Sequence, residues 1–155
     1  MRCSDTDAVM IAIEMEKRGA EFYRSAARCA KKEDTRALLT ALAADEDVHE
    51  KDFRRLLAEV GTEEYPFETA AFLEGIAADI AFPEGLMGML KSGLDDRRAY
   101  LEHAVNSEMT SIRFYTEMYV KANDAHARGV FRDIAAIEQM HLTKLRRAVG
   151  MEDPA

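Results

Sequence analysis

A set of polar residues occurs twice in this chain of 155 residues, and the second copy is displaced by 92 positions. In each copy a glutamate is followed seven positions later by a tyrosine, and further on by a glutamate and a histidine three positions apart. The separations inside the two copies are identical, so the two halves of the chain are expected to fold alike. The first copy comprises Glu16, Tyr23, Glu46 and His49, and the second comprises Glu108, Tyr115, Glu138 and His141.

Both copies lie within segments that have the hydrophobic pattern of amphipathic helices. Apolar residues recur at alternating spacings of three and four, which is typical of a helix with one buried face. The repeated polar residues share the register of the apolar ones, so we expect them to point into the core. Polar groups are costly there unless they are paired or bound to metal. The four segments are residues 9–30, 39–60, 101–122 and 131–148.

The four helices are expected to form two antiparallel hairpins, over residues 5–60 and 94–150. In each hairpin the two glutamates should face each other, which places the turns midway between them, near residues 31 and 123. Polar residues that favour turns and helix caps occupy both places. They are Lys31, Lys32, Glu33 and Asp34 in the first turn, and Asn123 and Asp124 in the second.

Residues 61–93 break the helical pattern and connect the two hairpins. This stretch holds five of the eight glycines and two of the three prolines, with a short helix expected over residues 70–80. A connector of this length can run back along the bundle, which would make the second and third long helices parallel. The sequence therefore predicts a single all-α domain over residues 1–155. Its fold is a four-helix bundle with one long crossover between helices 2 and 3.

Composition and charge exclude several other classes of protein. The formal net charge of −8 argues against nucleic acid as a partner, because phosphate binding needs a basic surface. No stretch reads as a membrane span or a signal peptide, so no membrane partner is expected. Cys3 and Cys29 form no metal-binding pair, and reduced thiols are the simplest interpretation. We therefore expect a cytoplasmic protein.

The repeated residues are a ligand set for two metal ions. A glutamate and a histidine three positions apart on a helix point to the same side, so each such pair offers an oxygen and a nitrogen together. A further glutamate from each of the other two helices completes the set found in di-iron and di-manganese carboxylate bundles. Four carboxylates also balance two divalent cations, and ligand type alone leaves iron, manganese and zinc open. The predicted ligands are Glu16, Glu46, His49, Glu108, Glu138 and His141.

Three other residues are candidates for supporting the ligands. Tyr23 and Tyr115 lie two turns along the same helix faces, and we expect each to donate a hydrogen bond to a ligating carboxylate. Simple packing in the core is the alternative for these tyrosines. Asp45 precedes Glu46 and could steady a histidine, but Ile137 holds the equivalent position in the second copy. Any such contact would therefore be present on one side only.

Four stretches, AIEMEKRGAEFY, ADEDVHEKDF, NSEMTSIRFY and AAIEQMHLTKL, resemble the helices of the rubrerythrin branch of the ferritin-like superfamily. The resemblance covers nearly the whole chain and implies a ferritin-like bundle that holds two irons. It also implies a role for each ligand. Glu46 and Glu138 would be bridging carboxylates, Glu16 and Glu108 terminal carboxylates, and His49 and His141 the single nitrogen ligands of the two metals.

The sequence departs from the rubrerythrin pattern in two places. Rubrerythrins carry a small C-terminal iron domain held by two Cys-x-x-Cys pairs, and this sequence contains no such pair. A separate electron-donor protein is therefore expected. Rubrerythrins also have a second glutamate one turn after the ligand of the third helix, which exchanges with histidine during peroxide turnover. Ser111 occupies that position here, so the site should be more symmetric than theirs.

The sequence thus favours a non-haem di-iron oxidoreductase that reduces hydrogen peroxide or dioxygen. One alternative is a non-catalytic protein that binds iron, manganese or zinc. Another is a ferroxidase that belongs to an iron-storing cage. Cages normally need features beyond four helices, and this chain shows no clear fifth helix of that kind, so a homodimer is the expected assembly.

Overall fold

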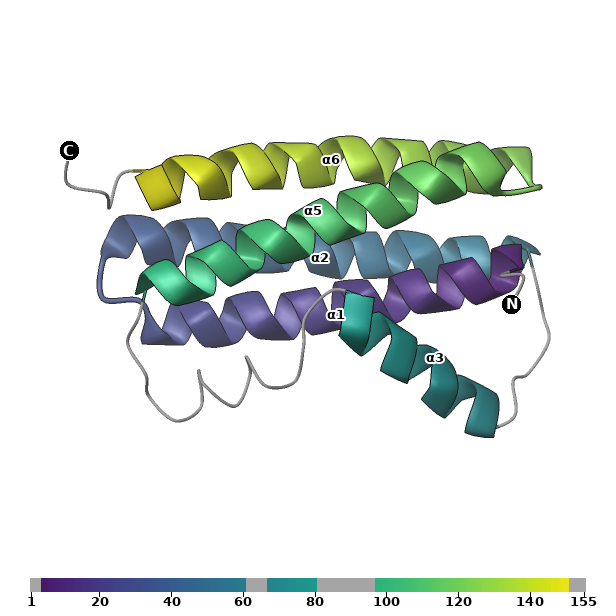
Figure 1. The fold of residues 1–155 in the computed structure, drawn as a ribbon, viewed down its shortest axis with the longest axis horizontal. Coiled ribbons are helices and arrows are strands. Elements are labelled where there is room, and N and C mark those ends of the chain that lie inside the picture. The colour runs from purple at the N-terminus through teal and green to yellow at the C-terminus, as the bar shows by residue number, and fades with distance from the viewer. Residues whose placement is uncertain (1–3, 61–66, 81–96, 151–155) are drawn as a thin grey trace.

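The computed structural model describes residues 4–60, 67–80 and 97–150, and these residues form five α-helices and no strand. Four long helices lie side by side, and the shorter α3 packs beside α1 (Figure 1). The predicted all-α, ferritin-like bundle is therefore confirmed. The helices are α1 (Asp5–Cys29), α2 (Glu33–Val60), α3 (Phe67–Ile80), α5 (Arg97–Lys121) and α6 (Ala125–Gly150).

The directions of the helices establish how the two hairpins are connected. α1 packs antiparallel to α2, and α5 packs antiparallel to α6, whereas α2 and α5 run in the same direction (Figure 1). The chain must therefore cross the length of the bundle between α2 and α5, as predicted. α3 belongs to this crossover and contacts α1 and α5. The rest of the expected connector and the expected start of the second hairpin fall at residues 61–66 and 81–96, outside the described residues.

Both hairpin turns lie where the sequence places them, between Cys29 and Glu33 and between Lys121 and Ala125. Two arginines that sequence reasoning overlooked close these turns in the same way. Arg36 Nη2 donates to the carbonyl oxygen of Ala30 at 2.8 Å, and Arg128 Nη1 donates to that of Ala122 at 2.9 Å. Arg128 follows Arg36 by 92 residues, and Ala122 follows Ala30 by the same distance. The repeat therefore extends from the polar core to the turns.

Aromatic packing in the core and polar contacts nearer the surface join the two hairpins. The ring of Phe53 on α2 lies 5.3 Å from that of Tyr115 on α5 and 5.4 Å from that of Phe131 on α6. At the N-terminus of α1, the Asp5 carboxylate accepts hydrogen bonds from the backbone N–H groups of Asn123 (3.0 Å) and Asp124 (2.8 Å). Asp5 thereby holds the second turn against the first helix.

Replacing Asp5 by alanine should lower the free energy of unfolding by about 1 kcal/mol, because two backbone donors lose a charged acceptor. Urea denaturation of the two proteins measures the difference. Asp5→Asn, which keeps one acceptor oxygen, should fall between them. Equal stability of all three proteins would show that the contact contributes nothing to folding.

None of the described helices is both long and apolar enough to cross a membrane.

Candidate metal centre

The six predicted ligands meet in the middle of the bundle. They come from four helices: one glutamate from α1, one from α5, and a glutamate with a histidine from each of α2 and α6. Every one of these residues is at most 2 % exposed, although each is ionisable. Such a concentration of buried ionisable groups is costly in a protein core. The residues are Glu16, Glu46, His49, Glu108, Glu138 and His141.

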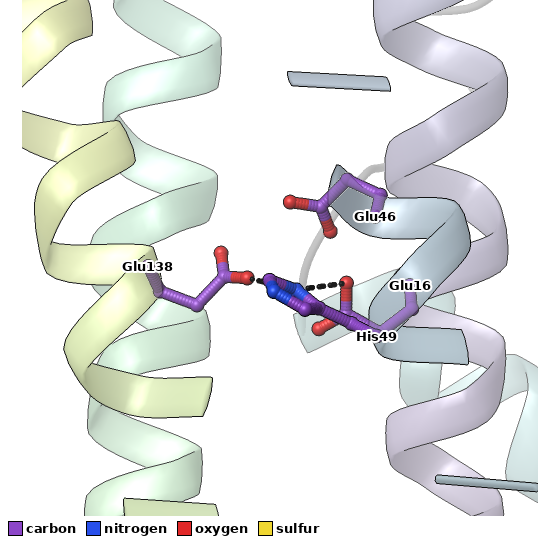
Figure 2. Close-up of side chains that lie close together, drawn as sticks. All are labelled: Glu16, Glu46, His49 and Glu138. Atoms are coloured by element: carbon purple, nitrogen blue, oxygen red, sulfur yellow. Dashed lines mark ion pairs between the residues drawn. The ribbon is translucent and has the colours of Figure 1, made fainter. Parts of the chain in front are cut away.

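The six side chains form two overlapping groups of possible ligands. Within each group, one nitrogen or oxygen atom from every residue lies within 4.8 Å of the others. Figure 2 shows one group, in which the carboxylates of α1, α2 and α6 converge on the ring of His49. Glu46 and Glu138 belong to both groups. The first group is Glu16, Glu46, His49 and Glu138, and the second is Glu46, Glu108, Glu138 and His141.

The two histidines present the same ring nitrogen to the carboxylates. Nδ1 of His49 lies 2.9 Å from Glu138 Oε1 and 3.4 Å from Glu16 Oε2. Nδ1 of His141 lies 3.1 Å from Glu46 Oε1 and 3.5 Å from Glu108 Oε1. The two rings stack with their centroids 5.8 Å apart. One nitrogen and several oxygens therefore face each other on each side of the site.

Several ligand atoms of the site are buried without a hydrogen-bond partner among the described residues. A buried polar atom without a partner costs free energy, and native proteins contain few of them. Here six of them gather in one place, and all belong to the predicted ligands. This arrangement fits a site built around cations, because a metal ion needs several oxygen and nitrogen atoms that converge on one position. The atoms are Glu16 Oε2, Glu46 Oε1, His49 Nδ1, Glu108 Oε2, Glu138 Oε1 and His141 Nδ1.

Without cations, protons must balance the charge of the site. Burial lowers the pKa of His49, but contacts with Glu138 and Glu16 raise it by more, to about 10. Burial also lowers the pKa of His141, and Glu108 and Glu138 raise it by more, to about 11. Both imidazoles are therefore protonated at neutral pH in the metal-free protein.

Three carboxylates of the site are of two kinds. Burial raises the pKa of Glu46 well above its usual range, and the charges of Glu138 and Glu16 raise it further. Burial and the charge of Glu138 raise the pKa of Glu108 in the same way. Burial also raises the pKa of Glu138, but contacts with Glu108, His141 and His49 lower it by more, to below its usual range. Glu138 is thus the anion that the two imidazolium rings share.

The tyrosines contact the site crosswise, each reaching a carboxylate of the other hairpin. The Tyr23 hydroxyl donates to Glu108 Oε1 at 2.6 Å, and the Tyr115 hydroxyl donates to Glu16 Oε1 at 2.6 Å. Both tyrosines are completely buried. Burial raises the pKa of each hydroxyl well above its usual value, and the neighbouring carboxylates raise it further. The hydroxyls therefore stay protonated and can donate over the whole physiological range.

Four further polar residues show how far the site extends. Asp45 Oδ2 lies 3.0 Å from His141 Nε2, whereas Ile137, which has no hydrogen-bonding side chain, holds the equivalent position in the second copy, so the one-sided contact is confirmed. Ser111 is 5 % exposed and lies one helical turn from Glu108, inside the core. His103 and His126 are exposed, and His126 contacts Glu59 at the surface, so neither joins the site.

Comparisons with known proteins agree with this geometry. A family model described as rubrerythrin matches residues 7–149, which is most of the chain. A solved structure of a hypothetical protein from Pyrococcus furiosus has a similar fold, with a TM-score of 0.72 and 22 % sequence identity. The similarity covers 96 % of this chain and 89 % of that one, and at this identity it supports the fold alone. No curated protein matches.

Proposed function

The chain belongs to the rubrerythrin family, and from this premise we propose that it is a non-haem di-iron oxidoreductase that reduces hydrogen peroxide or dioxygen. The observation that carries the proposal is the pair of overlapping ligand groups that share Glu46 and Glu138. Two cations held next to each other by shared carboxylates can deliver two electrons to one oxidant molecule. A single isolated cation site would not support this proposal.

Each residue of the site has a role under this proposal. Glu46 and Glu138 would be shared by the two metals, because they alone belong to both groups. Glu16 and His49 would complete the set of ligands for one metal, and Glu108 and His141 would complete the other set. The tyrosines hold Oε1 of Glu108 and of Glu16. They leave Oε2 of each carboxylate buried and without a hydrogen bond. They also fix the orientation of the carboxylates, as outer hydrogen-bond partners commonly do.

The proposal is tested by mixing the iron(II)-loaded protein with oxidant in a stopped-flow spectrometer. Hydrogen peroxide should oxidise the protein rapidly, with about one peroxide consumed for every two irons. Dioxygen, tested separately, shows which oxidant reacts faster. An iron(II)-loaded protein that reacts with neither oxidant would contradict the proposed activity while leaving the metal site in place.

The buried Ser111 favours a second candidate function, in which the protein handles metal without reducing peroxide. The glutamate found at this position in rubrerythrins takes part in their peroxide turnover, and serine cannot replace its carboxylate. Iron storage with ferroxidase activity, or the binding of manganese or zinc, would then be the role of the site. Metal analysis of the protein isolated from its native cells separates these functions. A full complement of zinc without any redox response would favour the second candidate.

Metal loading should release protons, because both histidines are protonated in the metal-free protein and a metal ligand must be deprotonated. The apparent affinity for Mn²⁺ should therefore rise with pH and level off as pH approaches the histidine pKa values of about 10 and about 11. Titration calorimetry in buffers of different ionisation enthalpy measures the protons released. An affinity that is constant between about pH 6 and about pH 9 would contradict this protonation scheme.

We further propose that the protein acts in the cytoplasm as a homodimer and receives electrons from a separate protein. Gel filtration distinguishes a dimer from a monomer or from a larger cage. Reduction of the oxidised protein by candidate electron-transfer proteins, followed by absorption, tests the donor.

A further inference from the structure

The two sides of the candidate metal centre differ in one polar contact. Asp45 precedes Glu46 on α2, and its Oδ2 lies 3.0 Å from Nε2 of His141 on α6. Ile137 precedes Glu138 on α6 and holds the equivalent position relative to His49. Isoleucine offers no hydrogen-bonding atom. Among the described residues, a carboxylate oxygen lies within 4 Å of Nδ1 of His49 but none lies within 4 Å of its Nε2.

The contact with Asp45 determines how the His141 ring presents itself to the site. A neutral imidazole that donates Nε2–H to a carboxylate keeps its lone pair on Nδ1, and the neutral ring is the form that binds a metal. Nδ1 of His141 faces Glu46 Oε1 at 3.1 Å and Glu108 Oε1 at 3.5 Å, which is the side where the ligand atoms converge. The carboxylate thus fixes both the tautomer and the rotation of the ring. It also makes the imidazole a better electron donor toward a bound cation.

Asp45 can orient the His141 ring without being a metal ligand itself. Its side chain is 48 % exposed, whereas that of His141 is 1 % exposed. The carboxylate therefore sits at the surface of the bundle and reaches inward to the outer edge of the ring. Its negative charge adds to the field on the His141 side only. The ring of His49 has to keep its orientation without such a contact.

We propose that Asp45 is a positioning residue for His141 and makes the two metal positions unequal, so that the position at His141 fills first. This inference rests on the two-metal site of the proposed function. Carboxylates that support a histidine ligand commonly change metal affinity by about 10- to 100-fold. The two positions of this chain should differ by a factor of that size, although their ligands are otherwise equivalent.

Titration of the metal-free protein with Co²⁺, followed by calorimetry and visible absorption, tests the proposal without any redox turnover. The wild-type protein should bind two ions in two separate steps. Asp45→Ala should weaken the tighter step by about 10- to 100-fold and merge it with the weaker one. Asp47→Ala is the matched control. Asp47 lies on the same helix, has a side-chain exposure of 46 %, and pairs with Arg24 rather than with a ligand.

The reciprocal substitution, Ile137→Asp, tests whether the tighter metal binding depends on where the carboxylate lies or only on its charge. Position 137 corresponds to position 45 in the 92-residue repeat, and His49 corresponds to His141. The new carboxylate should therefore support His49 as Asp45 supports His141. The weaker step should then tighten, and combining Ile137→Asp with Asp45→Ala should reverse the order of filling. Single variants His141→Ala and His49→Ala assign the two steps, because each should remove one of them.

The possible outcomes separate this inference from the proposed function. Two equal steps in the wild-type protein, or an Asp45→Ala isotherm identical to that of Asp47→Ala, would overturn the role of Asp45 and leave the two-metal site intact. Fewer than two ions bound by the wild-type protein would overturn both. Asp45→Asn keeps an acceptor oxygen but no charge, and it should give an intermediate affinity. Circular dichroism of each metal-free variant shows that the helices are retained.

Discussion

Glu138→Gln is expected to abolish the binding of both metal ions and to destabilise the metal-free bundle by about 3 kcal/mol at neutral pH. The loss of metal follows from the place of Glu138 in both ligand groups. The loss of stability has a different cause, because Glu138 is also the anion between two protonated histidines in the metal-free protein. Removing one partner of a buried ion pair leaves an uncompensated charge, which is strongly destabilising. Glutamine has nearly the same shape, so no cavity contributes to the effect.

The pH dependence of this destabilisation provides an independent check. Partners that raise the pKa of a histidine stabilise the folded protein fully below the unfolded pKa of about 6.5. That contribution is lost as pH rises through the folded values, which are about 10 for His49 and about 11 for His141. The difference in unfolding free energy between wild type and Glu138→Gln should therefore shrink as pH increases. Urea denaturation of both metal-free proteins at several pH values measures it, and a difference independent of pH would contradict the shared-anion role.

Glu46→Gln should abolish metal loading as completely as Glu138→Gln does. Unlike that variant, it should leave the metal-free bundle as stable as the wild type or more stable. Glu46 is 2 % exposed, and burial together with the neighbouring charges raises its pKa well above the usual range. The folded protein thus favours the neutral form of this group, and Oε1 has no hydrogen-bond partner. Glutamine is also neutral, so the substitution costs the metal-free protein little. The metals lose a shared charged ligand.

Glu46 and Glu138 belong to both ligand groups, so the two substitutions are informative as a pair. Both variants should lack metal, but only Glu138→Gln should unfold at a lower urea concentration. A large destabilisation by Glu46→Gln would mean that Glu46 supports the fold independently of metal. Full metal loading of either variant would mean that the corresponding carboxylate is not a bridge.

The helices, the turns and the meeting of the six ligands could be predicted from the sequence because local rules govern them. The spacing of three and four places Glu16 and Glu108 on buried faces, and a hairpin whose glutamates face each other has only one place for its turn. The parallel arrangement of α2 and α5 also followed, because the connector is long enough to span the bundle.

Other features depend on how the two hairpins are rotated against each other, which no local pattern specifies. Each tyrosine was expected to reach a carboxylate, but that Tyr23 reaches Glu108 and Tyr115 reaches Glu16 required the structure. The partner of Asp45 was equally open, since either histidine could have been within reach. Arg36 and Arg128 were overlooked, although their displacement of 92 residues was a visible signal.

The metal content of the reconstituted protein tests the central claim most directly. After anaerobic loading with iron(II) and removal of excess metal, the wild-type chain should retain about two irons, the complement of a dinuclear carboxylate site. Glu46→Gln and Glu138→Gln should retain almost none under the same conditions. A wild-type chain that retains no iron, or variants that retain as much as the wild type, would contradict the claim that this buried cluster is a dinuclear metal site.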